Sequence, residues 1–139
     1  MSLEDLYQDK ILELSRFSRT VEQLQHYKNS STSKNPVCGD TISLRLDYDN
    51  DFKVIDYGHE VRGCVICEAS AGLLSKYIIG KSLKEVKIIN QNVLQWLNSE
   101  ISLPNISELE TFTPVKEFKN RHKCVTLSFD ALVEVCKNL

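Results

Sequence analysis

Residues 41–48, TISLRLDY, alternate strictly between apolar and polar side chains. A period of two predicts a strand with one face buried against a core. A turn at DND (49–51) follows, and then two shorter strands at FKVIDY (52–57) and HEVRGC (59–64), so we predict a small antiparallel meander. The apolar face of the first strand consists of Ile42, Leu44, Leu46 and Tyr48.

The sequence before this meander predicts a helical region followed by a loop. Residues 3–24 are rich in Leu, Glu and Gln, with apolar side chains near helical spacing, so we predict one or two helices there. KNSSTSKNP (28–36) is polar throughout apart from its final proline, which disfavours helix at the preceding residue. We therefore predict a loop over these residues.

The chain after the meander predicts helices. An apolar stripe that starts just after Cys64 predicts a helix that stops at Gly80, and Ser82 begins another helix through a capping box with Glu85. A short helix is predicted at 103–112 with Ser107 as its cap, then a loop, then a last helix from about Lys123. Because the strands form one run and the helices another, we predict an α+β fold, in a single domain over residues 1–139.

The composition argues against several classes of protein. A net charge of −2 with dispersed Lys and Arg disfavours binding to nucleic acid or an anionic membrane, since both need a basic face. No apolar run approaches the roughly 20 residues of a membrane span. The first residues, MSLEDLYQDK, lack the basic-then-apolar order of a signal peptide. We therefore expect a cytoplasmic protein with no nucleic-acid or membrane partner.

The chain has five cysteines, which should stay reduced in the cytosol, so metal or catalytic roles outrank disulfides. Three of them fall at predicted element boundaries, where a helix N-terminus lowers the pKa of a thiol. The other two sit within predicted helices. From spacing alone, a metal site and a set of buried small thiols both remain open. The boundary cysteines are Cys38, Cys64 and Cys124, and the helical ones are Cys67 and Cys136.

Three local motifs resemble a known family. NPVCGD (35–40), GCVICEAS (63–70) and RHKCVTLSFDAL (121–132) resemble, in order, the three cysteine motifs of the U-type iron–sulfur cluster assembly proteins, the IscU, SufU and NifU N-terminal family. The likeness covers about residues 35–139, and LEDLYQDKIL is similar to the first helix of the family. This resemblance implies an α+β fold with a small three-stranded antiparallel sheet packed by several helices.

The resemblance also implies one metal site made from Cys38, Asp40, Cys64 and Cys124. Gly39 would let the backbone turn so that the Cys38 thiolate and the Asp40 carboxylate face one ion. Three thiolates and one carboxylate suit Zn²⁺, and the carboxylate is the more exchangeable ligand. Without the resemblance, a turn or strand cap would be the simpler interpretation of Asp40.

Two branches of this family do different work. One is a scaffold on which a [2Fe–2S] cluster is assembled and transferred, and the SufU-like branch accepts persulfide sulfur from a PLP-dependent cysteine desulfurase at a zinc site. The segment between Cys64 and Cys124 is long, as in SufU-like proteins, and Arg121 precedes Cys124 by three residues, as in that branch. Lys123 stands where the scaffold branch has histidine. These details favour the SufU-like branch.

The resemblance therefore implies that Cys38 accepts sulfur, with Arg121 bonding a carboxylate or persulfide near the metal. The implied partners are the desulfurase and iron–sulfur acceptor or assembly proteins. Two alternatives stay open: a scaffold that holds a [2Fe–2S] cluster or iron on Cys38, Cys64 and Cys124, and an interaction domain with a purely structural zinc. Whether the chain is a zinc-dependent sulfurtransferase or a non-enzymatic scaffold stays open with them.

Other residues have simpler interpretations. Cys64 and Cys67 form a C-x-x-C pair, but the βαβ context of a thioredoxin-like redox site is absent. We expect His59 and His122 to lie at the surface or beside the ligands rather than to bind metal.

Overall fold

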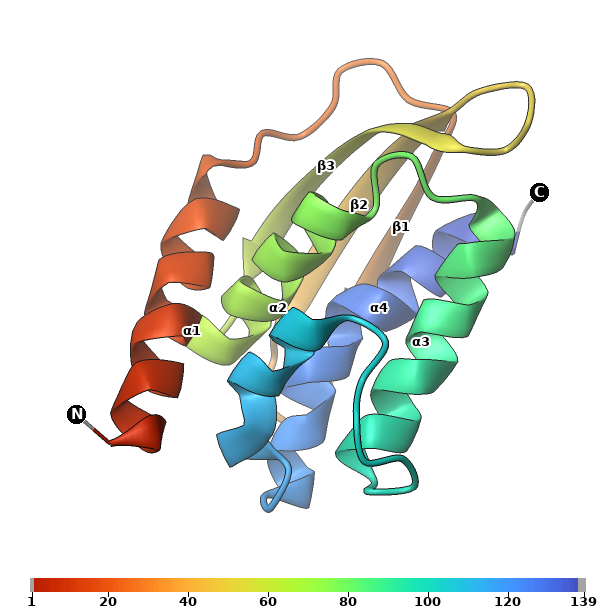
Figure 1. Ribbon diagram of the computed structural model, residues 1–139. Coiled ribbons are helices and arrows are strands. Elements are labelled where there is room, and N and C mark those ends of the chain that lie inside the picture. Colours follow the sequence, from red (N-terminus) through yellow and green to blue (C-terminus); the bar gives the residue numbers. More distant parts are fainter. Residues whose placement is uncertain (1, 138–139) are drawn as a thin grey trace.

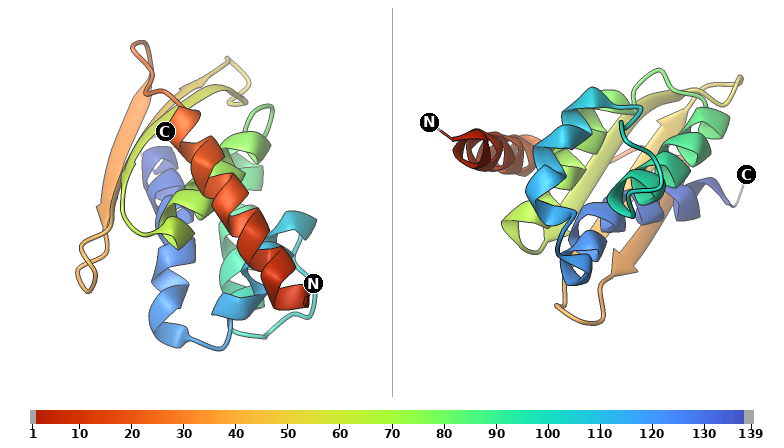
Figure 2. Two further views of the ribbon diagram at one scale, coloured as in Figure 1. Left: turned by 90° about the vertical axis from the view of Figure 1, so that its left-hand side faces the viewer. Right: turned by 60° about the horizontal axis from the view of Figure 1, so that its bottom comes forward.

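In the computed structural model, which describes residues 2–137, three antiparallel strands form one sheet in the order β1–β2–β3. They are β1 (Asn29–Lys34), β2 (Thr41–Tyr48) and β3 (Val54–Arg62). Figure 1 shows the sheet behind the helices, and the left view in Figure 2 shows the helices gathered on one side of it. The predicted α+β fold with a three-stranded antiparallel sheet is confirmed.

Four α-helices lie on one side of the sheet. They are α1 (Leu3–Thr20), α2 (Val65–Tyr77), α3 (Leu83–Leu97) and α4 (His122–Cys136). Of these helices, α2 and α4 pack against the strands, α1 packs against α2, and α3 packs against α4. As predicted, Ser82 caps α3 by accepting the Glu85 backbone N–H at 3.2 Å, and Gly80 follows α2 with φ +84°. Among the described residues, no helix is both long and apolar enough to cross a lipid bilayer.

β2 is the strand that the alternating pattern located, with its predicted bounds. Ile42, Leu44 and Leu46 are completely buried against the helices. The intervening side chains are only partly covered, since they lie on the opposite face of the sheet. The predicted helix from about Lys123 is α4, and its residues Leu127 and Ala131 are buried in the same core.

The predicted loop at 28–36 is wrong, because most of it is strand β1. Every residue of β1 is paired with β2, from Asn29 opposite Leu46 to Lys34 opposite Thr41. Its inward side chains are polar, and the Ser31 hydroxyl donates to the Ala131 carbonyl of α4 at 2.6 Å. Backbone pairing with a neighbour strand leaves no mark on hydrophobic periodicity, which explains the error.

The predicted strands 52–57 and 59–64 are one strand, β3, which runs through Gly58. A Cβ at Gly58 would lie 2.7 Å from the Glu22 carbonyl oxygen and would also clash with the backbone nitrogen of Leu24. The absence of a side chain at Gly58 therefore lets the chain after α1 cross closely over the strand. Gly58 is part of the strand and does not form a turn between two strands.

The connection from α3 to α4 contains two 3-10 helices, η1 (Ser107–Val115) and η2 (Lys119–Arg121). The predicted helix at 103–112 therefore begins later and is of a different type, Ser107 makes no cap hydrogen bond, and the predicted loop at 113–121 is partly helical. A 3-10 helix has three residues per turn, so residues three apart share a face. The buried residues with that spacing are Ile106, Leu109, Phe112 and Val115.

His59 is a buried structural residue that joins α1 to β3. Its Nε2–H donates to the Ser18 carbonyl at 2.9 Å, and its Nδ1 accepts the Tyr57 hydroxyl at 2.7 Å. Burial lowers the pKa of His59 below its ordinary value, so the ring is neutral. The expectation that His59 lies at the surface or beside the ligands is wrong.

Candidate metal centre

The turn between β1 and β2 is the NPVCGD segment, closed by two backbone hydrogen bonds. The Asn35 N–H donates to the Asp40 carbonyl and the Gly39 N–H donates to the Asn35 carbonyl, each at 2.8 Å. Gly39 has φ +77°, a conformation that favours glycine, as the predicted tight turn requires. This turn leaves the Cys38 side chain exposed and the Asp40 side chain buried.

The other two boundary cysteines lie at helix N-termini. Cys64 is the N-cap of α2, where its Sγ accepts the Cys67 backbone N–H at 3.4 Å. Cys124 is the third residue of α4 and is buried. Figure 1 shows that α2 and α4 both begin toward the lower end of the view.

The structure brings all four residues predicted for the metal site together. One ligand atom each from Cys38, Asp40 and Cys124 lie within 4.8 Å of one another. The Sγ of Cys64 lies 3.6 Å from Oδ2 of Asp40, and the Cys64 backbone N–H donates to Oδ1 of Asp40 at 3.3 Å. Three thiols and one carboxylate thus converge from three separate segments of the chain.

Without a bound cation, it is unfavourable for several side chains of this group to be negatively charged at the same time. Burial, together with the neighbouring Cys64, Asp40 and Cys38, raises the pKa of the Cys124 thiol to about 12. The lowering of the pKa expected from the helix N-terminus is therefore outweighed at Cys124. A bound cation would offset this repulsion, and three sulfurs with one carboxylate oxygen are ligands that zinc accepts. The residues present therefore fit a zinc ion.

Gly63 is a site residue that the sequence-based prediction missed. A Cβ at this position would lie 2.8 Å from Cγ and 2.9 Å from Oδ1 of Asp40, closer than side chains tolerate. The absence of a side chain therefore lets the carboxylate reach the Cys64 backbone. The signal was present in the sequence, since Gly63 opens the GCVICEAS motif, but no role had been assigned to it.

The helical cysteines lie inside their helices, Cys67 next to this group and Cys136 at the far end of α4. Cys67 is fully buried in α2, and burial raises the pKa of its thiol well above the ordinary value. Cys136 is buried in α4, and burial raises the pKa of its thiol to about 11. Neither belongs to the group of possible ligands found among the described residues.

Arg121 and His122 lie just before Cys124 but contribute differently. The exposed Arg121 side chain lines a mostly apolar groove of about 550 Å³, together with Leu12, Ile66 and Phe118. The His122 Nε2–H donates to the Lys116 carbonyl at 2.8 Å, which places this ring outside the group of ligands, as predicted.

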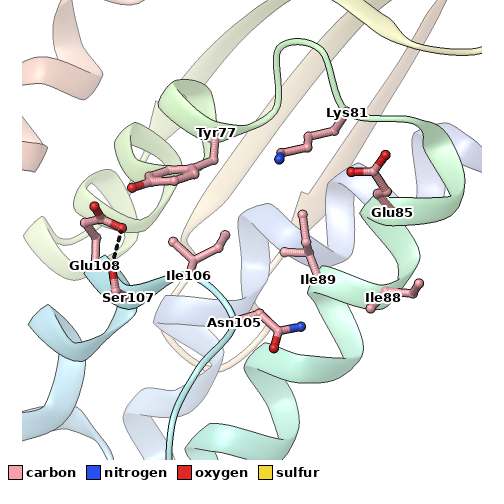
Figure 3. A pocket seen from close by; sticks show the side chains of 9 residues that line it. All are labelled: Tyr77, Lys81, Glu85, Ile88, Ile89, Asn105, Ile106, Ser107 and Glu108. Carbon is pink, nitrogen blue, oxygen red and sulfur yellow. Dashed lines mark hydrogen bonds between the residues drawn. The ribbon is translucent and has the colours of Figure 1, made fainter.

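Another hollow, of about 350 Å³, lies at the far end of α2 and has no thiol in its lining (Figure 3). Figure 3 shows Tyr77, Lys81, Glu85 and Glu108 around it, from α2, α3 and the neighbouring connections. The neighbouring Glu108 carboxylate, together with partial burial, raises the pKa of Tyr77 to about 12. This mixture of charges offers no set of metal ligands, so the candidate centre is at the cysteines.

Comparison with known proteins agrees with this fold and shows the family of the chain. A family model described as the NifU-like N-terminal domain matches residues 6–125. The chain is 33% identical over 105 residues to an iron–sulfur cluster assembly scaffold protein IscU of Streptococcus pyogenes serotype M1, a match that covers 74% of this chain and 65% of that protein. It is 32% identical over 123 residues to the zinc-dependent sulfurtransferase SufU of Bacillus subtilis strain 168, covering 78% and 82%.

A solved structure supports the same assignment. The crystal structure of a putative iron–sulfur cluster assembly scaffold protein of the SUF system from Fervidobacterium islandicum AW-1 superimposes with a TM-score of 0.87 at 26% identity. The superposition covers 98% of this chain and 100% of that one. Fold and site thus define the class of U-type assembly proteins, with three cysteines and an aspartate at one end of a small α+β domain. The chain belongs to the NifU-like N-terminal domain family of iron–sulfur cluster assembly proteins.

Proposed function

We propose that this chain accepts persulfide sulfur from a cysteine desulfurase at a zinc site, for use in iron–sulfur cluster biogenesis. The observation that carries the proposal is the convergence of an exposed thiol, Cys38, with the buried Asp40 and Cys124 within 4.8 Å of one another. The name of the Bacillus subtilis relative, a zinc-dependent sulfurtransferase, supports this role.

Cys38, Asp40, Cys64 and Cys124 would hold the zinc. When bound, zinc keeps its sulfur ligands in the thiolate form, which is the reactive form of cysteine. Asp40 is the one oxygen ligand in this set, and it is held in place by the Cys64 backbone N–H. A carboxylate exchanges more readily than a thiolate, so Asp40 is suited to a site whose ligands change during a reaction.

Cys38 is the proposed sulfur acceptor because it is the exposed thiol of the four residues and lies on a turn rather than in a helix. Its thiolate attacks the outer sulfur of the persulfide on the desulfurase. A bond forms between that sulfur and the Cys38 Sγ, and the sulfur–sulfur bond of the donor breaks. The electron pair leaves with the donor cysteine, which becomes a thiolate.

Arg121 is proposed to support this step from the rim of the adjacent groove. It is exposed and lies three residues before Cys124. A guanidinium binds carboxylates through two parallel hydrogen bonds, so Arg121 is suited to a carboxylate or persulfide that the partner brings to the site.

A scaffold role is the second candidate, because the relatives from Streptococcus pyogenes and Fervidobacterium islandicum carry scaffold names. In that role Cys38, Cys64 and Cys124 would hold a [2Fe–2S] cluster. Elemental analysis of protein purified without added metal separates the two. One zinc per chain supports sulfur acceptance or a purely structural zinc, and a coloured iron-bound form supports the scaffold.

Alanine release by the partner desulfurase then tests sulfur acceptance directly. The parent chain should stimulate release, Cys38→Ala should not, and Cys136→Ser should behave as the parent because Cys136 is buried elsewhere. Zinc content is measured for each variant at equal concentration. If Cys38→Ala keeps its zinc and stimulates the desulfurase like the parent, the proposed mechanism is wrong.

A further inference from the structure

A second thiol lies beside the proposed ligand Cys64. Cys67 is in the first turn of α2 and is completely buried. It is not among the four residues proposed to hold the metal, and the proposed sulfur transfer makes no use of it.

The two cysteines are arranged so that a disulfide can form between them. Cys64 is the N-cap of α2, with extended backbone angles, and Cys67 is the third residue of the helix. The Cys64 Sγ points back over the first turn, because it accepts the Cys67 backbone N–H at 3.4 Å. That backbone nitrogen is separated from the Cys67 sulfur by only the Cα and Cβ atoms, so the two sulfurs lie within reach of a disulfide.

The two thiols also differ in access to solvent. Cys64 is partly exposed, whereas Cys67 is completely buried behind it. Of these two thiols, a small oxidant from solution therefore reaches Cys64 before Cys67. Cys67 is then the neighbouring thiol that can react with the oxidised sulfur, as the second cysteine of a C-x-x-C pair does.

We propose that Cys64 and Cys67 form an oxidation-sensitive pair that closes into a disulfide when hydrogen peroxide reaches the site. Peroxide oxidises the Cys64 thiolate to a sulfenic acid and is reduced to hydroxide. The Cys67 sulfur then attacks the Cys64 sulfur, the sulfur–oxygen bond breaks, and water leaves with the Cys67 proton. The disulfide removes Cys64 from the ligand set, so metal is released until a reductant restores both thiols.

The metal-release part of this inference rests on the proposed function, since it needs Cys64 to be a ligand. The disulfide itself does not, and it can be mapped independently. Tryptic peptide 63–76 contains Cys64 and Cys67 and no other cysteine. After peroxide treatment of the zinc-loaded protein, this peptide should be two hydrogens lighter and resist alkylation. Links from Cys64 to Cys38 or Cys124, which join separate peptides, in place of this one would overturn the inference.

Reversibility provides the second readout. Zinc released by peroxide should rebind to the parent after treatment with dithiothreitol. Cys67→Ser should recover much less, because a sulfenic acid at Cys64 without its resolving thiol proceeds to the irreversible sulfinic acid. Cys136→Ser is the matched control, since it removes another buried thiol and should recover like the parent. Equal recovery of Cys67→Ser and the parent, or loss of zinc from unoxidised Cys67→Ser, would contradict the inference.

Discussion

The Asp40 carboxylate accepts two hydrogen bonds from Cys64, one from its backbone N–H at 3.3 Å and one from its thiol at 3.6 Å. This contact joins the β1–β2 turn to the N-cap of α2. Gly63 lies directly against the carboxylate, so the contact depends on the absence of a side chain there. The geometry of the candidate metal centre is therefore set by residues beyond its four ligands.

Replacing Gly63 by alanine should weaken zinc binding while the fold is kept. The new methyl would lie within 3 Å of the Asp40 carboxylate, which must then move away from Cys64. Loss of a group that orients a ligand lowers metal affinity by about 10–100-fold, and we expect a loss in that range. Competition with a chelator of known affinity measures it. Arg62→Ala, at the exposed preceding residue, is the control and should bind like the parent.

Two substitutions of Asp40 separate its charge from its hydrogen bond. Asp40→Asn keeps an oxygen that can accept the Cys64 N–H, so its stability should stay near that of the parent. Asp40→Ala leaves that donor without a partner and should lower the free energy of unfolding by about 1–3 kcal/mol. Both should reduce desulfurase turnover, because the exchangeable ligand is gone. Full turnover with either variant would show that Asp40 is only a turn residue.

Chelation should lower the melting temperature of the metal-loaded protein. The site joins three separate segments, and binding at a thousand times the dissociation constant contributes about 4 kcal/mol to stability. In a domain of this size that corresponds to more than about 10 °C. Thermal unfolding with and without chelator, with zinc measured on the same samples, checks this expectation. Unchanged melting after complete zinc loss would contradict it.

Cys136→Ser should leave the zinc content unchanged and destabilise the fold modestly. Cys136 is buried in α4, so a serine hydroxyl placed there loses contact with water and should cost about 1–2 kcal/mol. Burial raises the pKa of the Cys136 thiol to about 11, so in the folded parent it should also resist alkylation at neutral pH. Chemical denaturation and elemental analysis test both points. A drop in zinc content would show that the ligand set is wrong.

His59 should make the metal-free protein less stable in mild acid. Its pKa is lowered by burial, so the unfolded chain, with an ordinary histidine pKa of about 6.5, binds the proton more tightly than the folded one. The contribution of neutral His59 to stability is therefore fully present above pH 6.5. Below that pH the free energy of unfolding decreases, by at most about 1.4 kcal/mol per pH unit. His59→Gln should remove this slope between pH 7 and 5. His26→Gln, at an exposed position, should retain it.

The sequence by itself located the elements whose side chains repeat with a regular period. The alternation of residues 41–48 defines β2 because each apolar residue falls on the buried face, and Ile42, Leu44 and Leu46 are completely covered. The sequence also predicted the stop of α2 at Gly80 and the start of α3 at Ser82, because both residues act through local backbone geometry. The family resemblance, carried by three short motifs, named the four residues that converge.

Only the tertiary structure decided what depends on neighbours distant in the chain. β1 is a strand because β2 pairs with its backbone and α4 accepts its polar side chains, and no apolar pattern records such partners. Gly58 lies within β3, where the backbone of residues 22–24 passes too close to leave room for a side chain. From the sequence alone, a glycine at this position is equally consistent with a turn. The approach of Asp40 to Cys64 and Gly63 likewise joins residues from two loops. Periodicity records the face of one element, but a contact between elements depends on how the whole chain packs.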